Sequence, residues 1–133
     1  MNSVHKITVG AEAEATAVVT KELTVRHFHA NMPEVYGTPF MIHLMETAAG
    51  NAVQPGLPAG WVTVGVGVNV RHLAPTPVGR TVTARARVTK VTAKLIEFEV
   101  QAHDGENLIG RGTHSRALVQ LERFEAPLSG RPA

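Results

Sequence analysis

Hydrophobic and polar positions follow two different periods along the chain. From Ile7 to Val25 they alternate loosely around a run of small residues, which predicts one or two strands. The segment HFHANMPEVYGTP then carries an asparagine, two prolines and a glycine, so it is expected to be an irregular loop. Alternation returns after residue 60 and continues almost to the C-terminus. The pattern therefore indicates strands at both ends of the chain with one interruption between them.

A helix accounts for the interruption. Two parallel rows of apolar residues stand four apart: Phe40, Leu44 and Ala48 in one row, and Met41, Met45 and Ala49 in the other. This spacing predicts one long helix from Thr38 to about Val53, with Thr38 as the N-cap and Pro39 at the first helical position. Gln-Pro-Gly follows and ends the helix. Because glycine weakens a helix, Gly50 is expected to allow close packing of the helix against a sheet.

The second half of the chain is predicted to be strand. Trp61 to Leu73 alternates, which places five valines and His72 on one face and Gly65 on the other, among polar and small residues. Three further antiparallel strands are predicted, at 81–92, 95–103 and 108–121.

One helix among antiparallel strands is typical of an α+β fold in which the sheet curls around a long central helix, the hot-dog arrangement. A single helix covers one face of such a sheet, whereas these strands carry apolar or small residues on parts of both faces. A homodimer or higher homo-oligomer would cover the rest, so we expect one. Residues 1–125 are expected to form a single domain, and 126–133 a flexible C-terminal tail.

Composition narrows the range of functions. A chain of 133 residues with 44% hydrophobic and 18% charged residues suits one globular domain. Its formal net charge of +2 is too small to indicate a nucleic-acid partner. Cysteine is absent, which excludes disulfides, thiolate nucleophiles and cysteine-ligated metals. Neither a signal sequence nor an apolar run of roughly 20 residues is present, so we expect a cytoplasmic protein without a membrane partner.

Two motifs of possible chemical interest have stronger structural interpretations. The glycine-rich GVGVN at 65–69 lies within a strand with no helix after it, so it does not fit a nucleotide-binding turn. Glycines in a strand do allow a ligand or a backbone to come close, and an exposed N–H near Gly65 suits an oxyanion. His27 and His29 are spaced like metal ligands but lack a third ligand at a suitable spacing. We expect no metal and no cofactor.

Glu46 is the most informative polar residue. It lies in the middle of the helix between apolar or small neighbours, at the edge of the buried face or inside a pocket. His72 continues a valine-rich strand face on which that helix must pack. A glutamate and a histidine that meet in a partly buried pocket can act as base or nucleophile and its partner, with pKa values adjusted by burial. His103 and His114, on the late strands, are each compatible with an ordinary structural histidine.

The sequence from Thr24 to about Phe124 resembles the fluoroacetyl-CoA thioesterase-like branch of the hot-dog thioesterases. The motifs that carry the resemblance are PEVYGTPFMIHLME, VNVRHLAPTPVGRTVTA and QAHDGENLIGRGTHSRALVQLERF. The resemblance implies hydrolysis of a small or medium acyl-CoA thioester, with Thr38, Glu46 and His72 as the catalytic set. It further implies that the backbone of Gly65 faces the thioester carbonyl and that Arg116 lies near the acyl-CoA site.

The chain departs from the fluoroacetyl-specific pattern at the entrance. FHANM between His27 and Pro33 is short, whereas the fluoroacetyl-specific enzyme has a longer lid that contains phenylalanine. Pro39 also follows the threonine where that enzyme has a smaller residue. Phe28 and Met32 are expected to line a more open entrance, so these departures weaken the case for fluoroacetyl selectivity rather than for thioester hydrolysis.

The roles within the catalytic set stay open at this point. A regular helix separates Thr38 and Glu46 by roughly 12 Å, too far for a direct hydrogen bond. Glu46 is compatible with a nucleophile or with a general base. Two alternative functions also remain, an enoyl-CoA hydratase or dehydratase of the same fold and a non-catalytic acyl-CoA or small-ligand binding module.

Overall fold

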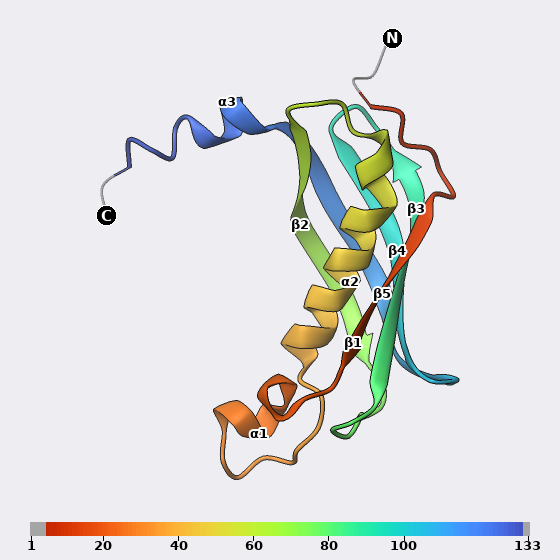
Figure 1. Cartoon of the computed structure of the whole chain (residues 1–133). Coiled ribbons are helices and arrows are strands. Elements are labelled where there is room, and N and C mark those ends of the chain that lie inside the picture. The colour runs from red at the N-terminus through yellow and green to blue at the C-terminus, as the bar shows by residue number, and fades with distance from the viewer. Residues whose placement is uncertain (1–4, 132–133) are drawn as a thin grey trace.

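A five-stranded antiparallel sheet with one long helix across a single face organises the chain (Figure 1). The computed structural model describes residues 5–131. The strands lie in the order β1-β3-β4-β5-β2, so that β1 and β2 are the two edges. Their bounds are β1 Glu12–Val18, β2 Trp61–His72, β3 Thr81–Val91, β4 Leu95–Asp104 and β5 Asn107–Gln120.

The long helix α2 spans Thr38–Val53, as the spacing predicts. Its N-cap is Gly37, however, and not Thr38, because Gly37 is still extended while its carbonyl already accepts hydrogen bonds from the N–H groups of Phe40 and Met41. Thr38 is therefore the first residue with helical geometry, and its hydroxyl is available to a partner outside the helix.

Short helices replace some of the predicted strand and loop. Between Ile7 and Val25, one strand forms, β1. It is followed by a 3₁₀ turn η1 at Lys21–Leu23 and a single-turn helix α1 at Val25–Phe28. A second 3₁₀ turn, η2 at Gln54–Gly56, ends α2, and α3 at Leu121–Glu125 follows β5. In Figure 1, α3 and residues 126–131 extend away from the sheet.

The core lies between α2 and the sheet. Six residues of α2 are buried, and they face alternate buried positions of β3 and β4: Met41, Leu44, Met45, Ala48, Ala49 and Val53 from the helix, and Val82, Ala84, Ala86, Val88, Ile96, Phe98, Val100 and Ala102 from the strands. Two glycines on β5 let neighbouring segments pack directly against the strand backbone. A methyl group added at Gly110 would meet the Met41 sulfur, and one at Gly112 would meet the Asn69 carbonyl of β2.

Gly50 does not have the role that the sequence suggests. A methyl group added there would meet no atom within 4 Å, so this position leaves open space next to the helix. Close packing between helix and sheet depends on small residues of the strands instead, among them Ala84 and Gly110.

A β-bulge interrupts β2 and changes which residues share a face. Gly65 lies opposite Arg116 and Gly67 opposite Ser115, so one extra residue, Val66, is accommodated between them. The prediction of unbroken alternation along this strand is therefore wrong. Because the bulge reverses the parity, Gly65 faces α2 on the same side as His72.

Candidate active site

Thr38 and His72 form the first of two polar clusters beside α2. The hydroxyl Oγ1 of Thr38 lies 2.8 Å from the Nδ1 of His72, across the junction between the start of α2 and the end of β2. Burial lowers the pKa of His72 below its ordinary value, an effect that the nearby Ala74 backbone partly offsets. The imidazole is therefore mostly neutral near pH 7, and in the tautomer with an unprotonated Nδ1 it accepts a hydrogen bond from the threonine hydroxyl.

The second ring nitrogen of His72, Nε2, is buried and has no hydrogen-bond partner among residues 5–131. A buried polar atom in this state is destabilising by about 1–3 kcal/mol unless another molecule or group pairs with it. The nitrogen is therefore suited to a water, a substrate or a second protein chain.

Glu46, Gly65 and Arg116 form the second cluster. The Glu46 carboxylate lies 3.7 Å from the Arg116 guanidinium, and its side chain is 38% exposed. A methyl group added at Gly65 would collide with the Oε2 of Glu46. Glycine at this position therefore lets the carboxylate come close to the strand backbone.

Arg116 is held firmly in this cluster. Its side chain is only 13% exposed, and it donates from Nε to the hydroxyl of Thr63 and from Nη2 to the carbonyl of Thr63, each at 2.9 Å. Burial lowers its pKa, and the Glu46 charge counteracts that effect. The fixed cation lies where negative charge would develop near Glu46.

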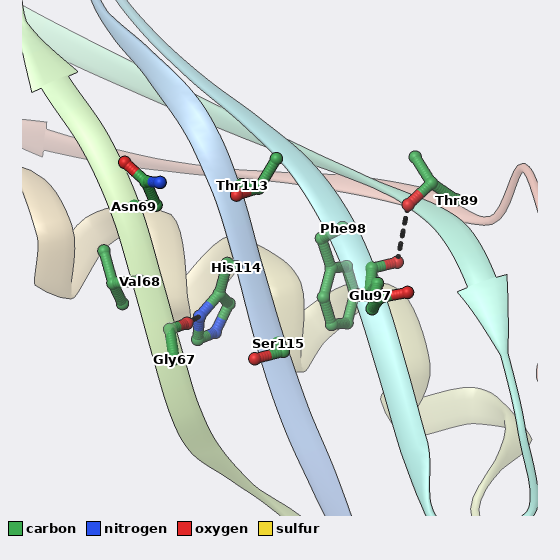
Figure 2. A pocket seen from close by; sticks show the side chains of 9 residues that line it. All are labelled: Gly67, Val68, Asn69, Thr89, Glu97, Phe98, Thr113, His114 and Ser115. Atoms are coloured by element: carbon green, nitrogen blue, oxygen red, sulfur yellow. Dashed lines mark hydrogen bonds between the residues drawn. The ribbon is translucent and has the colours of Figure 1, made fainter.

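His114 also belongs to this cluster, although its sequence position is equally compatible with an ordinary structural histidine. Its ring lies 3.3 Å from the Nη1 of Arg116 and hydrogen-bonds to the Gly67 carbonyl through Nδ1 at 2.7 Å. Figure 2 shows the ring beside Gly67, between β2 and β5. The signal that could have revealed it is the spacing of two residues between His114 and Arg116, which places both side chains on one face of a strand.

The two clusters do not meet within one chain. Thr38 and Glu46 both lie on α2, eight residues apart, so about 12 Å of regular helix separates them. The structure thus brings Thr38 to His72 and Glu46 to Gly65 and Arg116, and it leaves the two groups apart.

The predicted entrance residues lie near the Thr38 end of α2. Phe28 is 64% exposed and stacks on Phe40, with ring centroids 5.8 Å apart. A mostly apolar pocket of about 380 Å³ adjoins these rings and is lined by Thr24, Val25, Phe28, His29, Gly37, Pro39 and Phe40. Met32 is exposed, and its carbonyl accepts a hydrogen bond from Arg26. Both predicted entrance residues are therefore accessible to a ligand that approaches Thr38.

Within residues 5–131, no three side chains of the types that bind metal come together, His27 and His29 included. Of the helices in that range, none has the length and apolar character required to cross a bilayer.

Comparison with known proteins identifies the family of the chain. The family model described as fluoroacetyl-CoA-specific thioesterase matches residues 19–122. The chain belongs to this family. It is 41% identical over 124 residues to the fluoroacetyl-CoA thioesterase of Streptantibioticus cattleyicolor, with 89% of each sequence covered.

Solved structures of the fluoroacetyl-CoA-specific thioesterase family give the same result. The fluoroacetyl-CoA thioesterase FlK matches with a TM-score of 0.89 and 38% identity, over 96% of this chain and 99% of that chain. A Thermus thermophilus protein described as a thioesterase superfamily member matches with a TM-score of 0.87 and 32% identity, over 93% and 92% of the two chains. FlK variants with a replaced threonine have been solved with fluoroacetate and with acetyl-CoA. The predicted hot-dog fold and the predicted acyl-CoA thioesterase activity are confirmed.

Proposed function

We propose that Glu46 is the catalytic carboxylate of this thioesterase and that it acts on a carbonyl held against the backbone of Gly65. The observation that carries the proposal is their contact, in which any side chain at position 65 would displace the carboxylate. Glu46 would attack the thioester carbon or remove a proton from the attacking water. The backbone N–H of the bulged strand and Arg116 would stabilise the oxyanion.

Thr38 and His72 would act on the same substrate from the other cluster. Their 2.8 Å hydrogen bond and the lowered pKa of His72 keep a neutral imidazole next to the hydroxyl. This pair can orient a water molecule or the thioester sulfur. Departure of the thiolate needs little further help, because a thiol has a pKa of about 8.5.

We propose further that two copies of the chain complete the site. The edge strand β2 presents Val66 and Val68 with 57% and 43% exposure, and an edge strand offers unpaired backbone groups to another strand. A two-fold axis that pairs β2 with β2 would set the two α2 helices antiparallel. The Thr38 end of one helix would then approach the Glu46 region of the other, which joins the two clusters that one chain keeps apart.

The substrate is proposed to be a small or medium acyl-CoA thioester. Support comes from the family's relatives, which include structures with acetyl-CoA and with fluoroacetate. The exposed Phe28 and Met32 leave the approach to Thr38 more open than a closed lid would, which favours tolerance of larger acyl groups.

The direct test measures free thiol release from a panel of acyl-CoA thioesters. Acetyl-, fluoroacetyl-, butyryl- and phenylacetyl-CoA cover small and medium acyl groups. The proposal expects turnover of at least the smaller ones, and absence of thiol release from all four would contradict it. Light scattering on the same sample tests the assembly, and a stable monomer at full activity would rule out a site shared between two copies.

A further inference from the structure

His114 hydrogen-bonds to a backbone carbonyl beside the bulge in β2. The Gly67 carbonyl lies where the register between β2 and β5 shifts, and the Nδ1 of His114 lies 2.7 Å from its oxygen. A carbonyl oxygen can only accept a hydrogen bond, so Nδ1 must carry the proton. The hydrogen bond therefore fixes the tautomer of the ring.

The other ring nitrogen of His114 faces a cation. Nε2 lies 3.3 Å from the Nη1 of Arg116, and a guanidinium can only donate. With Nδ1 protonated, Nε2 has the free lone pair that this contact requires. Burial lowers the pKa of His114, the nearby Arg116 lowers it further, and the Gly67 hydrogen bond and the Glu46 charge oppose this. These are the groups that face the ring from β2, β5 and α2.

Packing leaves the ring little freedom to turn. It stacks on Phe98 of β4 with ring centroids 5.7 Å apart, and His114 as a whole is almost fully buried. On the other side, a methyl group added at Gly65 would lie 3.3 Å from the Cε1 of His114. Because the ring is stacked, buried and hydrogen-bonded to the strand backbone, it can fix the position of a side chain that contacts it.

We propose that His114 is a positioning residue for the thioesterase site: anchored on the Gly67 carbonyl, it accepts from Arg116 and holds that guanidinium facing Glu46. The Arg116 guanidinium carries four Nη hydrogens. Thr63 accepts hydrogen bonds from Nε and Nη2 only, on one side of the group. His114 constrains Nη1, the atom that lies 3.7 Å from the Glu46 carboxylate. The inference rests on the proposed function of Glu46 and assigns to His114 no contact with the substrate.

Kinetics of variants test the proposal. His114→Phe keeps a ring against Phe98 but has no polar atoms, so kcat is expected to fall by about 10-fold or more while KM changes little. His114→Asn keeps a donor for Gly67 and is expected to recover part of the loss. His103→Phe, a histidine of the adjacent strand β4 outside the site, is the matched control and should change kcat by less than about twofold.

A double substitution separates positioning from general packing. If His114 acts through Arg116, His114→Phe should lower kcat by at most about threefold when Arg116→Met is already present, because the two residues work as one unit. A full, independent loss in that background would overturn the proposal. Circular dichroism and thermal unfolding of each variant identify any that fail to fold.

A spectroscopic measurement tests the inference without reference to activity. Long-range proton–nitrogen correlation spectra of the ¹⁵N-labelled wild-type protein at about pH 7 should give a neutral His114 ring protonated at Nδ1. Arg116→Met should shift the Nε2 resonance through loss of its donor. A ring protonated at Nε2 would overturn the proposal even if the protein is an active thioesterase. The expected tautomer in a protein that releases no thiol would contradict the proposed function and leave the His114–Arg116 contact supported.

Discussion

The hydroxyl of Thr38 and the Nδ1 of His72 meet at 2.8 Å although 34 positions separate them in the sequence. The contact forms because the N-cap role falls to Gly37, which leaves the Thr38 side chain free, and because β2 ends beside the first turn of α2. It links the start of the only long helix among residues 5–131 to the far end of an edge strand.

Replacement of Thr38 tests whether the hydroxyl matters for activity. Thr38→Val keeps the shape and removes the hydrogen bond to His72, so kcat/KM is expected to fall by about 10-fold or more. Thr38→Ser keeps the hydroxyl and should retain most activity. Thr47→Val on the same helix removes a hydroxyl bonded only to the His43 carbonyl and serves as the control. Equal activity of the valine and serine variants would show that the hydroxyl has no catalytic role.

Glu46→Gln removes the negative charge at constant size. Thiol release is expected to fall by about 100-fold or more, because neither nucleophilic attack nor proton removal is possible for an amide. The fold should persist, since the side chain is partly exposed and its ion pair with Arg116 is long. Glu106→Gln, in the exposed turn between β4 and β5, is the control. Near-normal kcat in Glu46→Gln would show that Glu46 is a surface carboxylate without a catalytic role.

A methyl group added at Gly65 should lower activity, whereas one added at Gly50 should raise stability. Gly65→Ala places the methyl against the Glu46 carboxylate, so we expect a loss of kcat of about 10-fold or more with thermal stability reduced only slightly. Gly50→Ala adds a methyl to open space on a helix and should raise stability by up to about 1 kcal/mol. Thermal unfolding and thiol release measured on both variants decide the matter. An active Gly65→Ala variant would contradict the proposed approach of the substrate to this backbone.

Stability should depend on pH through two histidines. Burial lowers the pKa of His72 and of His114 in the folded protein. The unfolded chain therefore binds protons at these rings at a higher pH than the folded chain, with an unfolded pKa of about 6.5. Their contribution to the free energy of unfolding is complete above about pH 6.5 and is lost as the pH falls through the folded values.

Urea unfolding between pH 7.5 and pH 5 measures this dependence. His72→Asn is expected to flatten part of the slope, and His43→Asn, which alters an exposed helix residue, should leave it unchanged. The same slope in His72→Asn and in the wild type would show that burial does not act on this ring.

Selectivity between acyl groups should be modest. A pocket contact with one small substituent is worth about 1–3 kcal/mol, and Phe28 and Met32 are too exposed to enclose the acyl group fully. We therefore expect kcat/KM for fluoroacetyl-CoA and acetyl-CoA to differ by less than about 200-fold. The four-substrate panel described above provides the measurement. A ratio above about 10⁴ would show that selectivity arises from residues other than this entrance.

The helix and the late strands were predictable because their hydrophobic patterns are long and are separated by clear turn sequences. The rows through Phe40 and Met41, with Pro39 before them and Gln-Pro-Gly after them, locate α2 to within about a residue at each end. The turn at 104–107 follows from its Asp-Gly-Glu-Asn composition. The short helices of the N-terminal region were not predictable, because a single-turn helix such as α1 is too short for a hydrophobic pattern to repeat within it.

The site was predictable only in part. Glu46 is identified by its position on the helix, and the family resemblance implies Thr38 and His72 as members of the same set. Neither spacing nor resemblance predicts that Thr38 pairs with His72, and the expected meeting of Glu46 with His72 does not occur within one chain. The bulge escaped prediction because Val66 is a valine among alternating valines, so the extra residue leaves no mark in the composition. His114 was missed for a related reason: a histidine on a buried strand face looks the same in sequence whether it fills space or orients a neighbour.

The bulge makes the length of β2 as consequential as its composition. Deletion of Val66 would restore regular pairing with β5 and leave Gly65 and His72 six positions apart, so both would still face α2. Removal of a second residue from this segment would leave five positions between them, and regular alternation would then turn one of them to the opposite face. Gly65 would lose its contact with Glu46, or His72 its contact with Thr38. The strand can therefore lose one residue here, but not two, without separating the two halves of the site.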